Sequence, residues 1–378
     1  MTKSLFRRLT KKGFIISNFI VAILFLGAVC SKWLDPETYW IFGLMNIASF
    51  YFLAVLILFI FFWLFIKPRW ALISIITIAI TWRSANNIIA FKLPGKFSKQ
   101  KADNDIRIMS WNVAQFDVLN FSKTHEKFYK MMQLINENQP DIACFQEVVC
   151  SDSIGTTYLH LSTILDSLKF PYYHYSYENN ENWFGLNMHF GTIIFSKYPI
   201  VNKQSVSHAP FNYNSTFHYA DIVKNTDTIR VFNIHLQSLK FSKGNVTYIQ
   251  DESLKEKVTN ITESKSIINK MKSGLINRKK QSDWIREEMD KSPYFLIVCG
   301  DFNDVPNSYA YETLGNGLQN TFVEKGSGIG RTFSGIAPHL RIDNIFVDKK
   351  FKVTQFTRVA RRLSDHFPII ADINLNKQ

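Results

Sequence analysis

Acidic and amide side chains follow directly behind an apolar run in the segment YFLIVCGDFNDVPN, residues 294–307. An apolar run this short, bounded by turn residues, predicts a strand that is buried on both faces. Polar groups at the end of such a strand are costly to bury unless they have partners. Because side chains alternate along a strand, we expect Asp301 and Asn303 to share one face and Phe302 to point away into packing.

Other short apolar segments also end in a carboxylate, an amide or a histidine. These end residues are Asn112, Glu147, His235, Asp343, Asp365 and His366. If the segments lie side by side as strands, their ends can converge on one rim. Taken singly, each residue is a common turn or capping residue, but the joint pattern favours a shared site.

The residue types of this set suit the hydrolysis of a phosphoester. Carboxylates without cysteines favour a hard divalent cation, Mg²⁺ or Mn²⁺, over zinc. Such an ion polarises a phosphoryl group, and a neighbouring carboxylate positions or deprotonates water. Amides donate hydrogen bonds without adding negative charge, and histidines exchange protons near neutral pH.

The elements that must position these residues are mostly short strands. The predicted strands are IRIMSWNV (106–113), DIACFQEV (141–148), FGTIIFSKYPI (190–200), TIRVFNIHLQS (228–238), RIDNIFV (341–347) and SDHFPIIADI (364–373). Apolar residues at helical spacing predict an amphipathic helix within 124–140, and the charged region 247–290 is mostly helical in pattern. This order favours a layered α/β arrangement of two packed, largely antiparallel sheets.

The N-terminal third has the composition of a membrane anchor. The uncharged stretches 13–30 and 39–66 are long enough to cross a bilayer, and 70–82 is a shorter third candidate with tryptophan at both ends. A cleaved signal peptide is disfavoured, because Val29 is large for a cleavage box and a second long stretch follows.

Basic residues predict how this anchor is oriented. They precede the first stretch, from Lys3 to Lys12, and Lys67 and Arg69 separate the second stretch from the third. The positive-inside rule then places the N-terminus and the 67–69 loop in the cytoplasm. Three crossings would leave the rest of the chain on the extracytoplasmic side of the cell membrane, and two would leave it in the cytosol.

Bulk composition agrees with a phosphate-bearing partner without choosing one. The chain has 378 residues, 44 Lys and Arg against 31 Asp and Glu, and a formal net charge of +13. That balance suits a nucleic acid, an anionic membrane surface or another phosphate-bearing substrate. The four cysteines show neither a disulfide framework nor a paired-cysteine zinc pattern.

Six motifs in order, SWNV, FQEV, HLQS, GDFNDVPNS, RIDNIFV and SDHFPI, resemble those of the endonuclease/exonuclease/phosphatase superfamily, which has the deoxyribonuclease-like fold. The resemblance covers residues 104–376. It implies a four-layered α/β sandwich, preceded here by transmembrane helices, and a divalent-metal-dependent hydrolase. The expected divisions are a membrane anchor at 1–92, a linker at 93–103 and the catalytic domain at 104–378.

The resemblance also implies a role for each matching residue. Glu147 would ligate the metal, with Asn112 close to metal and phosphate and Asp365 near the metal. Asp301 would align or deprotonate the attacking water, and Asn303 would hold the phosphate. His235 would contact or protonate phosphate oxygens, and His366, oriented by Asp343, would be the acid/base or stabilise the transition state.

The substrate stays open at this point. A membrane-tethered, nuclease-like phosphodiesterase is the leading interpretation, although Ala114 stands where the apurinic endonucleases of this superfamily carry an acid. A phospholipid or sphingomyelin headgroup and an inositol phosphate are alternative substrates. A non-catalytic, membrane-tethered binding module is the alternative of another class, and it is disfavoured because no metal or histidine position is lost.

Overall fold

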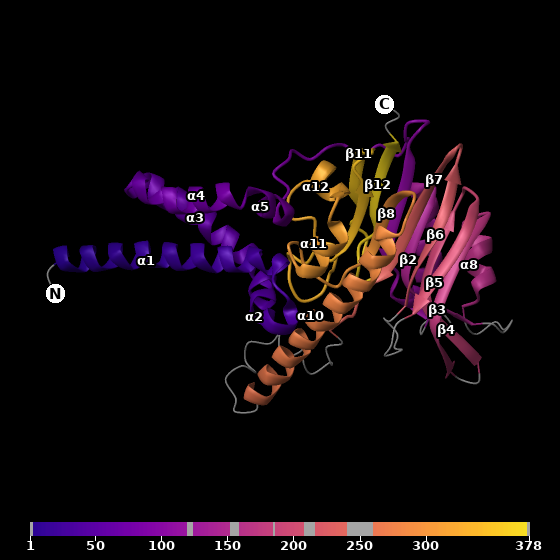
Figure 1. The fold of residues 1–378 in the computed structure, drawn as a ribbon, viewed down its shortest axis with the longest axis horizontal. Coiled ribbons are helices and arrows are strands. Elements are labelled where there is room, and N and C mark those ends of the chain that lie inside the picture. The colour runs from indigo at the N-terminus through magenta and orange to yellow at the C-terminus, as the bar shows by residue number, and fades with distance from the viewer. Residues whose placement is uncertain are drawn as a thin grey trace.

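Two six-stranded sheets make up the C-terminal part of the chain (Figure 1). The computed structural model describes residues 3–118, 124–151, 159–183, 186–207, 216–239 and 260–375. The first sheet has the order β11 (Phe351–Arg358), β12 (Ile369–Leu375), β1 (Ile106–Asn112), β2 (Ile142–Ser151), β4 (Leu186–Ser196) and β3 (Tyr172–Trp183). The second has the order β5 (Ile200–Ser207), β6 (Thr216–Lys224), β7 (Asp227–His235), β8 (Phe295–Asp301), β10 (Asp343–Asp348) and β9 (Leu318–Asn320).

The two central strands of each sheet run parallel, and the other neighbours run antiparallel. β1 pairs with β2 in parallel, and β7 pairs with β8 in the same way. Carboxyl ends of parallel neighbours lie at one edge of a sheet. Four of the predicted site residues, Asn112, Glu147, His235 and Asp301, therefore lie at or near such edges. The prediction of mostly antiparallel sheets is confirmed.

The sheets pack face to face and are covered by helices, which confirms the predicted four layers. Apolar residues between the sheets include Ile108, Cys144, Ile194, Val231 and Ile297, all of them buried. Helices α7 (Glu126–Asn138) and α8 (Leu161–Leu168) cover the outer face of the first sheet. Helices α10 (Asn260–Asp290) and α11 (Tyr309–Gly315) cover the second.

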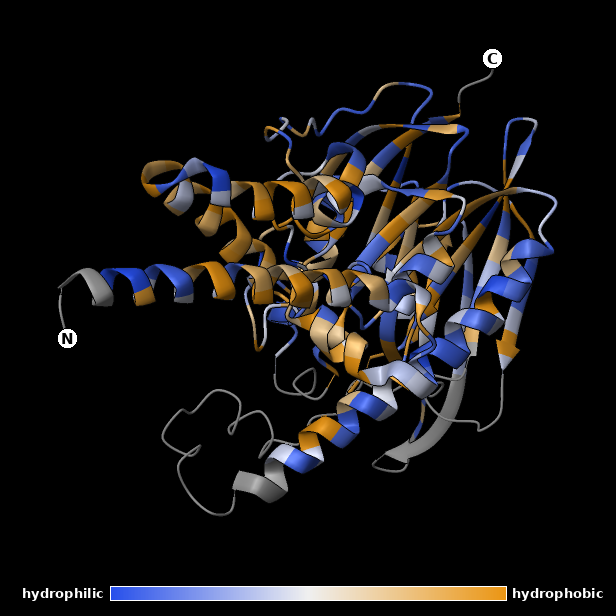
Figure 2. Cartoon of the chain, turned by 60° about the vertical axis from the view of Figure 1, so that its left-hand side comes forward, coloured by the Kyte–Doolittle hydropathy of each residue, from blue (hydrophilic) through white to orange (hydrophobic). Residues whose placement is uncertain are grey.

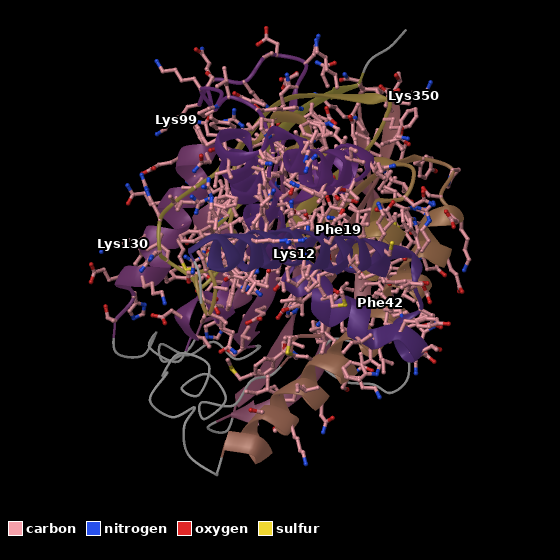
Figure 3. The ribbon with its side chains drawn as sticks, turned by 90° about the vertical axis from the view of Figure 1, so that its left-hand side faces the viewer. Lys12, Phe19, Phe42, Lys99, Lys130 and Lys350 are labelled. Atoms are coloured by element: carbon pink, nitrogen blue, oxygen red, sulfur yellow. The ribbon has the colours of Figure 1, made fainter. Side chains whose placement is uncertain are left out.

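A helical region precedes the sandwich and projects from one side of it (Figures 1 and 2). It consists of α1 (Lys3–Cys30), α2 (Pro36–Ile47), α3 (Ser49–Ile66), α4 (Ala71–Ile80) and α5 (Trp82–Ile88), joined by short 3₁₀ turns at Ser31–Trp33 and Pro68–Trp70. By length and composition, Arg7–Trp33 and Ser49–Ile66 could each cross a membrane, and Pro68–Ile80 is a shorter apolar helix. Figure 3 looks at the sandwich from this side, with Lys12 and Phe19 on α1 in front.

The predicted second apolar stretch, 39–66, is broken into two helices. α2 ends at Ile47 and α3 begins at Ser49. α2 packs against α10 of the sandwich, and the buried amide of Asn46 donates a hydrogen bond to the carbonyl of Pro306 (3.1 Å). This buried hydrogen bond keeps α2 against the sandwich. The helix that is long enough to cross a membrane therefore starts at Ser49.

Hydrogen bonds join the helical region to the loop that follows β8. The side-chain oxygen of the buried Asn307 accepts from Asn87 (3.0 Å), and its amide donates to the carbonyl of Ser84 (3.0 Å). The hydroxyl of Ser31 donates to the Asn307 carbonyl (3.1 Å). The loop that carries Asn303 is therefore fixed to the helical region a few residues further on.

Candidate active site

Sheet register brings three of the predicted residues next to one another. His235 ends β7 directly opposite Asp301 of β8, and Asp301 lies opposite Asp343 of β10. In the other sheet, Asn112 ends β1 beside Gln146 of β2. Both strand ends face the same side of the molecule, because Asn112 reaches from the first sheet to Asp301 in the second.

Asn112 is the link between the two sheets at the site. Its amide nitrogen donates to Glu147 Oε1 (3.0 Å) and to Asp301 Oδ2 (3.1 Å), while its oxygen accepts from the backbone N–H of Ala114 (3.1 Å). His235 lies beside the same two carboxylates, with Nε2 3.6 Å from Glu147 Oε1 and 3.7 Å from Asp301 Oδ2. Asn112 thus hydrogen-bonds both carboxylates, and His235, whose pKa is lowered by burial, lies next to them.

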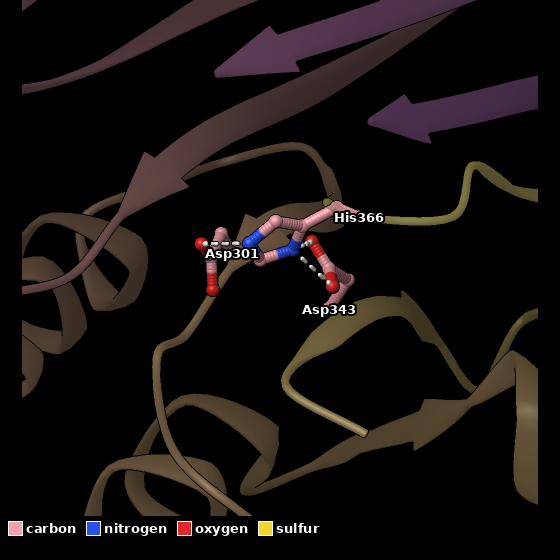
Figure 4. A group of neighbouring side chains, drawn as sticks. All are labelled: Asp301, Asp343 and His366. Carbon is pink, nitrogen blue, oxygen red and sulfur yellow. Dashed lines mark hydrogen bonds and ion pairs between the residues drawn. The ribbon is translucent and has the colours of Figure 1, made fainter. Parts of the chain in front are cut away.

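His366 lies between two aspartates (Figure 4). Its Nδ1 is 2.9 Å from Asp343 Oδ2, and its Nε2 is 3.6 Å from Asp301 Oδ2. Burial lowers the pKa of His366, but the carboxylates of Asp343 and Asp301 outweigh it and raise the pKa to about 10. Burial raises the pKa of Asp301 to about 6, against the opposing effect of His366. The arrangement favours an imidazolium flanked by carboxylates at neutral pH.

Glu147 reaches the site because β2 is irregular at this point. The pairing of β2 with β4 shifts register between Phe145 and Val148, and Glu147 has a φ of 54°. A non-glycine residue in this region is strained, and a bulge of this kind turns a side chain away from the regular alternation. Burial raises the pKa of the Glu147 carboxyl, and its hydrogen bond with Asn112 opposes that rise.

Asn303 differs from the prediction, because it does not continue the strand of Asp301. β8 ends at Asp301, and Asn303 has a φ of 50°. The Asn303 N–H donates to Asp301 Oδ1 (2.8 Å), which is the closing bond of an Asx turn. One Asn303 amide N–H donates to the Leu236 carbonyl (2.9 Å), and the NH₂ group has a second N–H to offer. Phe302 is fully buried, as predicted.

Asp365 completes the group at the mouth of a cavity of about 700 Å³. Its carboxylate accepts from the hydroxyl of Ser364 (3.1 Å), and its side chain is exposed. Glu147, Asp301, Asn303 and His366 line the same cavity. All of the predicted site residues are thus brought together, with Asn112, His235 and Asp343 behind those that line the cavity.

Three residues that hold the site in place were not singled out by the sequence reasoning. Gly300 has a φ of 144°, and a Cβ there would lie 1.9 Å from the carbonyl oxygen of Ile234, so the strands could not approach. The Thr332 hydroxyl accepts from the backbone N–H of Ile342 (3.0 Å) and Asp343 (3.1 Å). The third residue is Asn233. The sequence carries a signal for it, because an amide inside an apolar strand needs buried hydrogen-bond partners.

Asn233 connects the two sheets directly beneath Glu147 and His235. Its amide donates to the carbonyls of Phe145 (3.1 Å) and Ile193 (2.9 Å), and its oxygen accepts from Gln146 (2.7 Å). These bonds cross from β7 to β2 and β4 and satisfy a fully buried amide. They fix the separation of the sheets where the site is built.

The carboxylates at the cavity fit a hard divalent cation. Glu147 and Asp365 offer oxygen atoms to the cavity, and no cysteine belongs to the group, which suits Mg²⁺ or Mn²⁺. Asp301, Asp343 and His366 also have potential ligand atoms within 4.8 Å of one another. In that second group Nδ1 of His366 is bonded to Asp343, and an imidazolium cannot ligate a metal, so Glu147 and Asp365 are the better ligands.

Comparison with family models gives two matches. The model of the Endonuclease/Exonuclease/phosphatase family matches residues 109–366. A model described as a domain of unknown function (DUF8431) matches residues 11–88. No curated protein matches the sequence.

Solved structures with the same fold share little sequence with this chain. An endonuclease/exonuclease/phosphatase from Beutenbergia cavernae DSM 12333 has 18% identity and a TM-score of 0.52, covering 72% of each chain. A family protein from Leptotrichia buccalis C-1013-b has 19% identity and a TM-score of 0.49, covering 71% of this chain and 99% of its own. D. rerio TDP2, solved with a single-strand DNA product, has 16% identity and a TM-score of 0.49, covering 72% and 100%. At 18% identity, the likeness to the Beutenbergia cavernae structure concerns the fold alone.

Proposed function

Because this chain belongs to the endonuclease/exonuclease/phosphatase family, we propose that it is a membrane-tethered phosphodiesterase that depends on a divalent cation, Mg²⁺ or Mn²⁺. The family supports the coarser function, hydrolysis of a phosphoester bond. The observation that carries the proposal is the placement of Asp301 beside the His366–Asp343 ion pair at one cavity. A base and an acid at one phosphate suit attack by water on a diester, whose leaving alkoxide needs a proton.

Asp301 is the proposed base for the attacking water. Its Oδ1 is held by the N–H of Asn303 and its Oδ2 by the amide of Asn112, so the carboxylate has one orientation. The pKa of Asp301, raised by burial to about 6, lies nearer to neutral pH than that of an ordinary aspartate. Brønsted behaviour makes such a carboxylate a more effective base at that pH.

His366 is the proposed acid, and three other residues bind around the phosphate. Asp343 orients the imidazole and keeps it protonated, so His366 can give a proton to the leaving oxygen. His235 and Asn303 would donate hydrogen bonds to phosphate oxygens. Glu147 and Asp365, with Asn112 beside them, would hold the cation, which when bound neutralises charge that develops on the phosphoryl group.

Hydrolysis of a soluble diester tests this proposal. The full chain in detergent is expected to hydrolyse bis(4-nitrophenyl) phosphate with Mg²⁺ and to stop when the cation is chelated. Asp301→Ala and His366→Ala should each lower the rate by at least about 10²-fold, the usual contribution of a positioned acid or base. Wild-type rates in either variant would refute the roles, and an inactive wild-type protein would favour the non-catalytic binding module.

The helical region is the proposed tether, with residues 1–92 as anchor, 93–103 as linker and 104–378 as catalytic domain. The first turns of α1 and the turn between α3 and α4 lie at the end away from the sandwich (Figure 1), and the like charges of Lys11, Lys67 and Arg69 lie close together there. With that basic end in the cytoplasm, the catalytic domain is extracytoplasmic. Reporter fusions at residue 100 test this orientation. If a reporter that works solely in the cytosol is active there, the catalytic domain is cytosolic and the proposed orientation is wrong.

A further inference from the structure

Apolar residues from several parts of the chain also line the cavity at the site. We call this set the apolar wall, and it consists of Ile47, Leu239, Met271, Phe333, Ile336 and Leu340. At about 700 Å³ the cavity can enclose a molecule larger than a phosphate group. A substrate that fills it therefore has an apolar portion next to its phosphate.

The charges around the cavity do not suit a polyanion. Among the described residues that line it, Arg278 is the single lysine or arginine, and its guanidinium is paired with Asp304 (Nε to Oδ2, 3.0 Å). Proteins that bind a nucleic-acid strand do so through several basic groups along its backbone. Apart from the imidazolium of His366 and the His339 ring, the described lining offers mainly carboxylates and apolar side chains, which favours a substrate with one phosphate.

Ile336 is held in a strained conformation beside the catalytic group. Its φ is 46°, which is rare for a β-branched residue, and its side chain is 38% exposed. The loop around it is pinned by the Ser334 N–H, which donates to the carbonyl of Asp365 (2.7 Å). Such strain persists where the surrounding structure imposes it, and here it presents an apolar side chain to the cavity.

The apolar wall continues into the start of a membrane-length helix. The carbonyl of Ile47, the last residue of α2, is bonded to Nε2 of His339 (3.1 Å). The His339 ring stacks on Phe50 (5.2 Å between centroids, 2° between planes) and meets the edge of Tyr51 (4.8 Å). Phe50 and Tyr51 lie in the first turn of α3. The cavity therefore lies at the end of α3 that faces the sandwich.

Exposed aromatic residues mark this end of the helical region as a membrane surface. They are Trp33, Tyr39, Tyr51 and Trp82. Trp33 follows α1, Tyr39 lies in α2, Tyr51 lies in the first turn of α3 and Trp82 begins α5. Tryptophan and tyrosine gather at the level of lipid headgroups. The mouth of the cavity is thus placed where the phosphates of a bilayer lie.

We infer that the substrate is a glycerophospholipid of the membrane, with its phosphodiester at the strand ends and its acyl chain along the apolar wall. This inference rests on the function proposed above and names the substrate class for the same site. The oxygen of water bonds to phosphorus, one P–O ester bond breaks, and the leaving alkoxide takes a proton. The products are an alcohol and a phosphomonoester.

The test compares three phosphodiesters with the full chain in mixed micelles containing Mg²⁺. The probes are dioleoylphosphatidylglycerol, bis(4-nitrophenyl) phosphate and a single-stranded oligonucleotide. Ile336→Asn removes the apolar side chain and keeps a residue that tolerates positive φ. It should lower the ratio of lipid to soluble-diester rates at least about tenfold, the effect of losing about two buried methylene groups. Met271→Gln, on α10, is a second variant and should act in the same direction.

A matched control is Val201→Asn, because Val201 is an exposed β-branched residue of β5 that does not line the cavity. It should leave the ratio unchanged. Hydrolysis of the soluble diester but not of the lipid, or faster cleavage of the oligonucleotide than of the lipid, would overturn the inference and leave the proposed function standing. Ratios unchanged in both wall variants would also overturn it. Inactivity toward all three probes would instead remove the proposed function.

Discussion

Two buried sites in the same sandwich, one around His366 and one around the pair His174 and His218, hold these histidines in opposite charge states. At the strand ends, the carboxylates of Asp343 and Asp301 overcome burial and raise the pKa of His366 to about 10. Between the sheets, His174 of β3 and His218 of β6 meet with ring centroids 4.8 Å apart. Burial lowers the pKa of His174 to about 4 and takes that of His218 well below its ordinary value.

The partners of each histidine explain the difference. Thr192 Oγ1 lies 2.7 Å from Nδ1 of His218, and Ser205 Oγ lies 3.3 Å from Nε2 of His174. A hydroxyl can satisfy one ring nitrogen but offers no charge to balance a second proton, whereas a carboxylate does both. A buried histidine that contacts hydroxyls stays neutral here, whereas His366 stays protonated because a carboxylate lies within hydrogen-bonding distance. His235, whose nearest carboxylates are 3.6 and 3.7 Å away, has its pKa lowered by burial. Of the two sites, the one around His366 borders the cavity.

Among the changes that test this difference between the histidines, Asp343→Asn should have the largest effect. The change keeps the shape of the side chain but removes the charge that orients and stabilises the imidazolium of His366. We expect kcat on bis(4-nitrophenyl) phosphate to fall about 10²-fold with little change in KM, the pattern for a group that acts in the transition state. A matched fall in kcat and in thermal stability would instead indicate a structural role.

The control for Asp343→Asn removes the hydrogen-bond partner of His218. Thr192→Val is close in shape and deletes the hydroxyl bonded to His218. It should lower the free energy of unfolding by about 1–2 kcal/mol, the cost of a buried hydrogen bond that loses one member. Because Thr192 does not line the cavity, kcat should stay at the wild-type value. A loss of kcat comparable with that of Asp343→Asn would erase the distinction between the two sites.

A smaller effect should appear when the pH is lowered. A histidine whose pKa is lower in the folded state binds protons more readily when unfolded, so it stabilises the fold above its unfolded pKa of about 6.5. That contribution is lost as pH falls from about 6.5 toward about 4 for His174. The histidines should therefore lower the midpoint of thermal unfolding in detergent between about pH 7 and about pH 5, while Asp301, whose pKa is raised to about 6, acts in the opposite direction. His218→Gln should show a shallower fall, and an equal slope would contradict the assignment.

The fold and most of the site were accessible from the sequence because strand ends have a local signature. A carboxylate or histidine after a buried apolar run needs partners, and the neighbouring strand ends supply them. That reasoning locates His235, Asp301 and Asp343, which sheet register then places side by side. It also locates the helix over 124–140, because apolar spacing reports a buried face directly.

What could not be predicted depends on irregular backbone and on distant segments. Glu147 was found by type, but the bulge that turns it into the site is a property of pairing with β4. Asn303 was expected on a strand and lies in a turn, because its own N–H bonds the Asp301 carboxylate. The apolar wall combines Ile47 with Met271 and Ile336, and no local pattern connects residues so far apart in the chain.

The hydrogen bonds of Asn307 have a consequence for how the chain changes over evolution. Asn307 exchanges side-chain and backbone hydrogen bonds with Ser31, in the turn after α1, and with Ser84 and Asn87, both in α5. Ser84 contributes its backbone carbonyl, which any residue would supply, but substitution of Asn307 or Asn87 leaves a buried partner unmatched. An accepted change at one of these two positions therefore requires a compensating change at the other. The helical region and the loop after β8 are therefore expected to be inherited together, with correlated substitutions at these positions among relatives that share both.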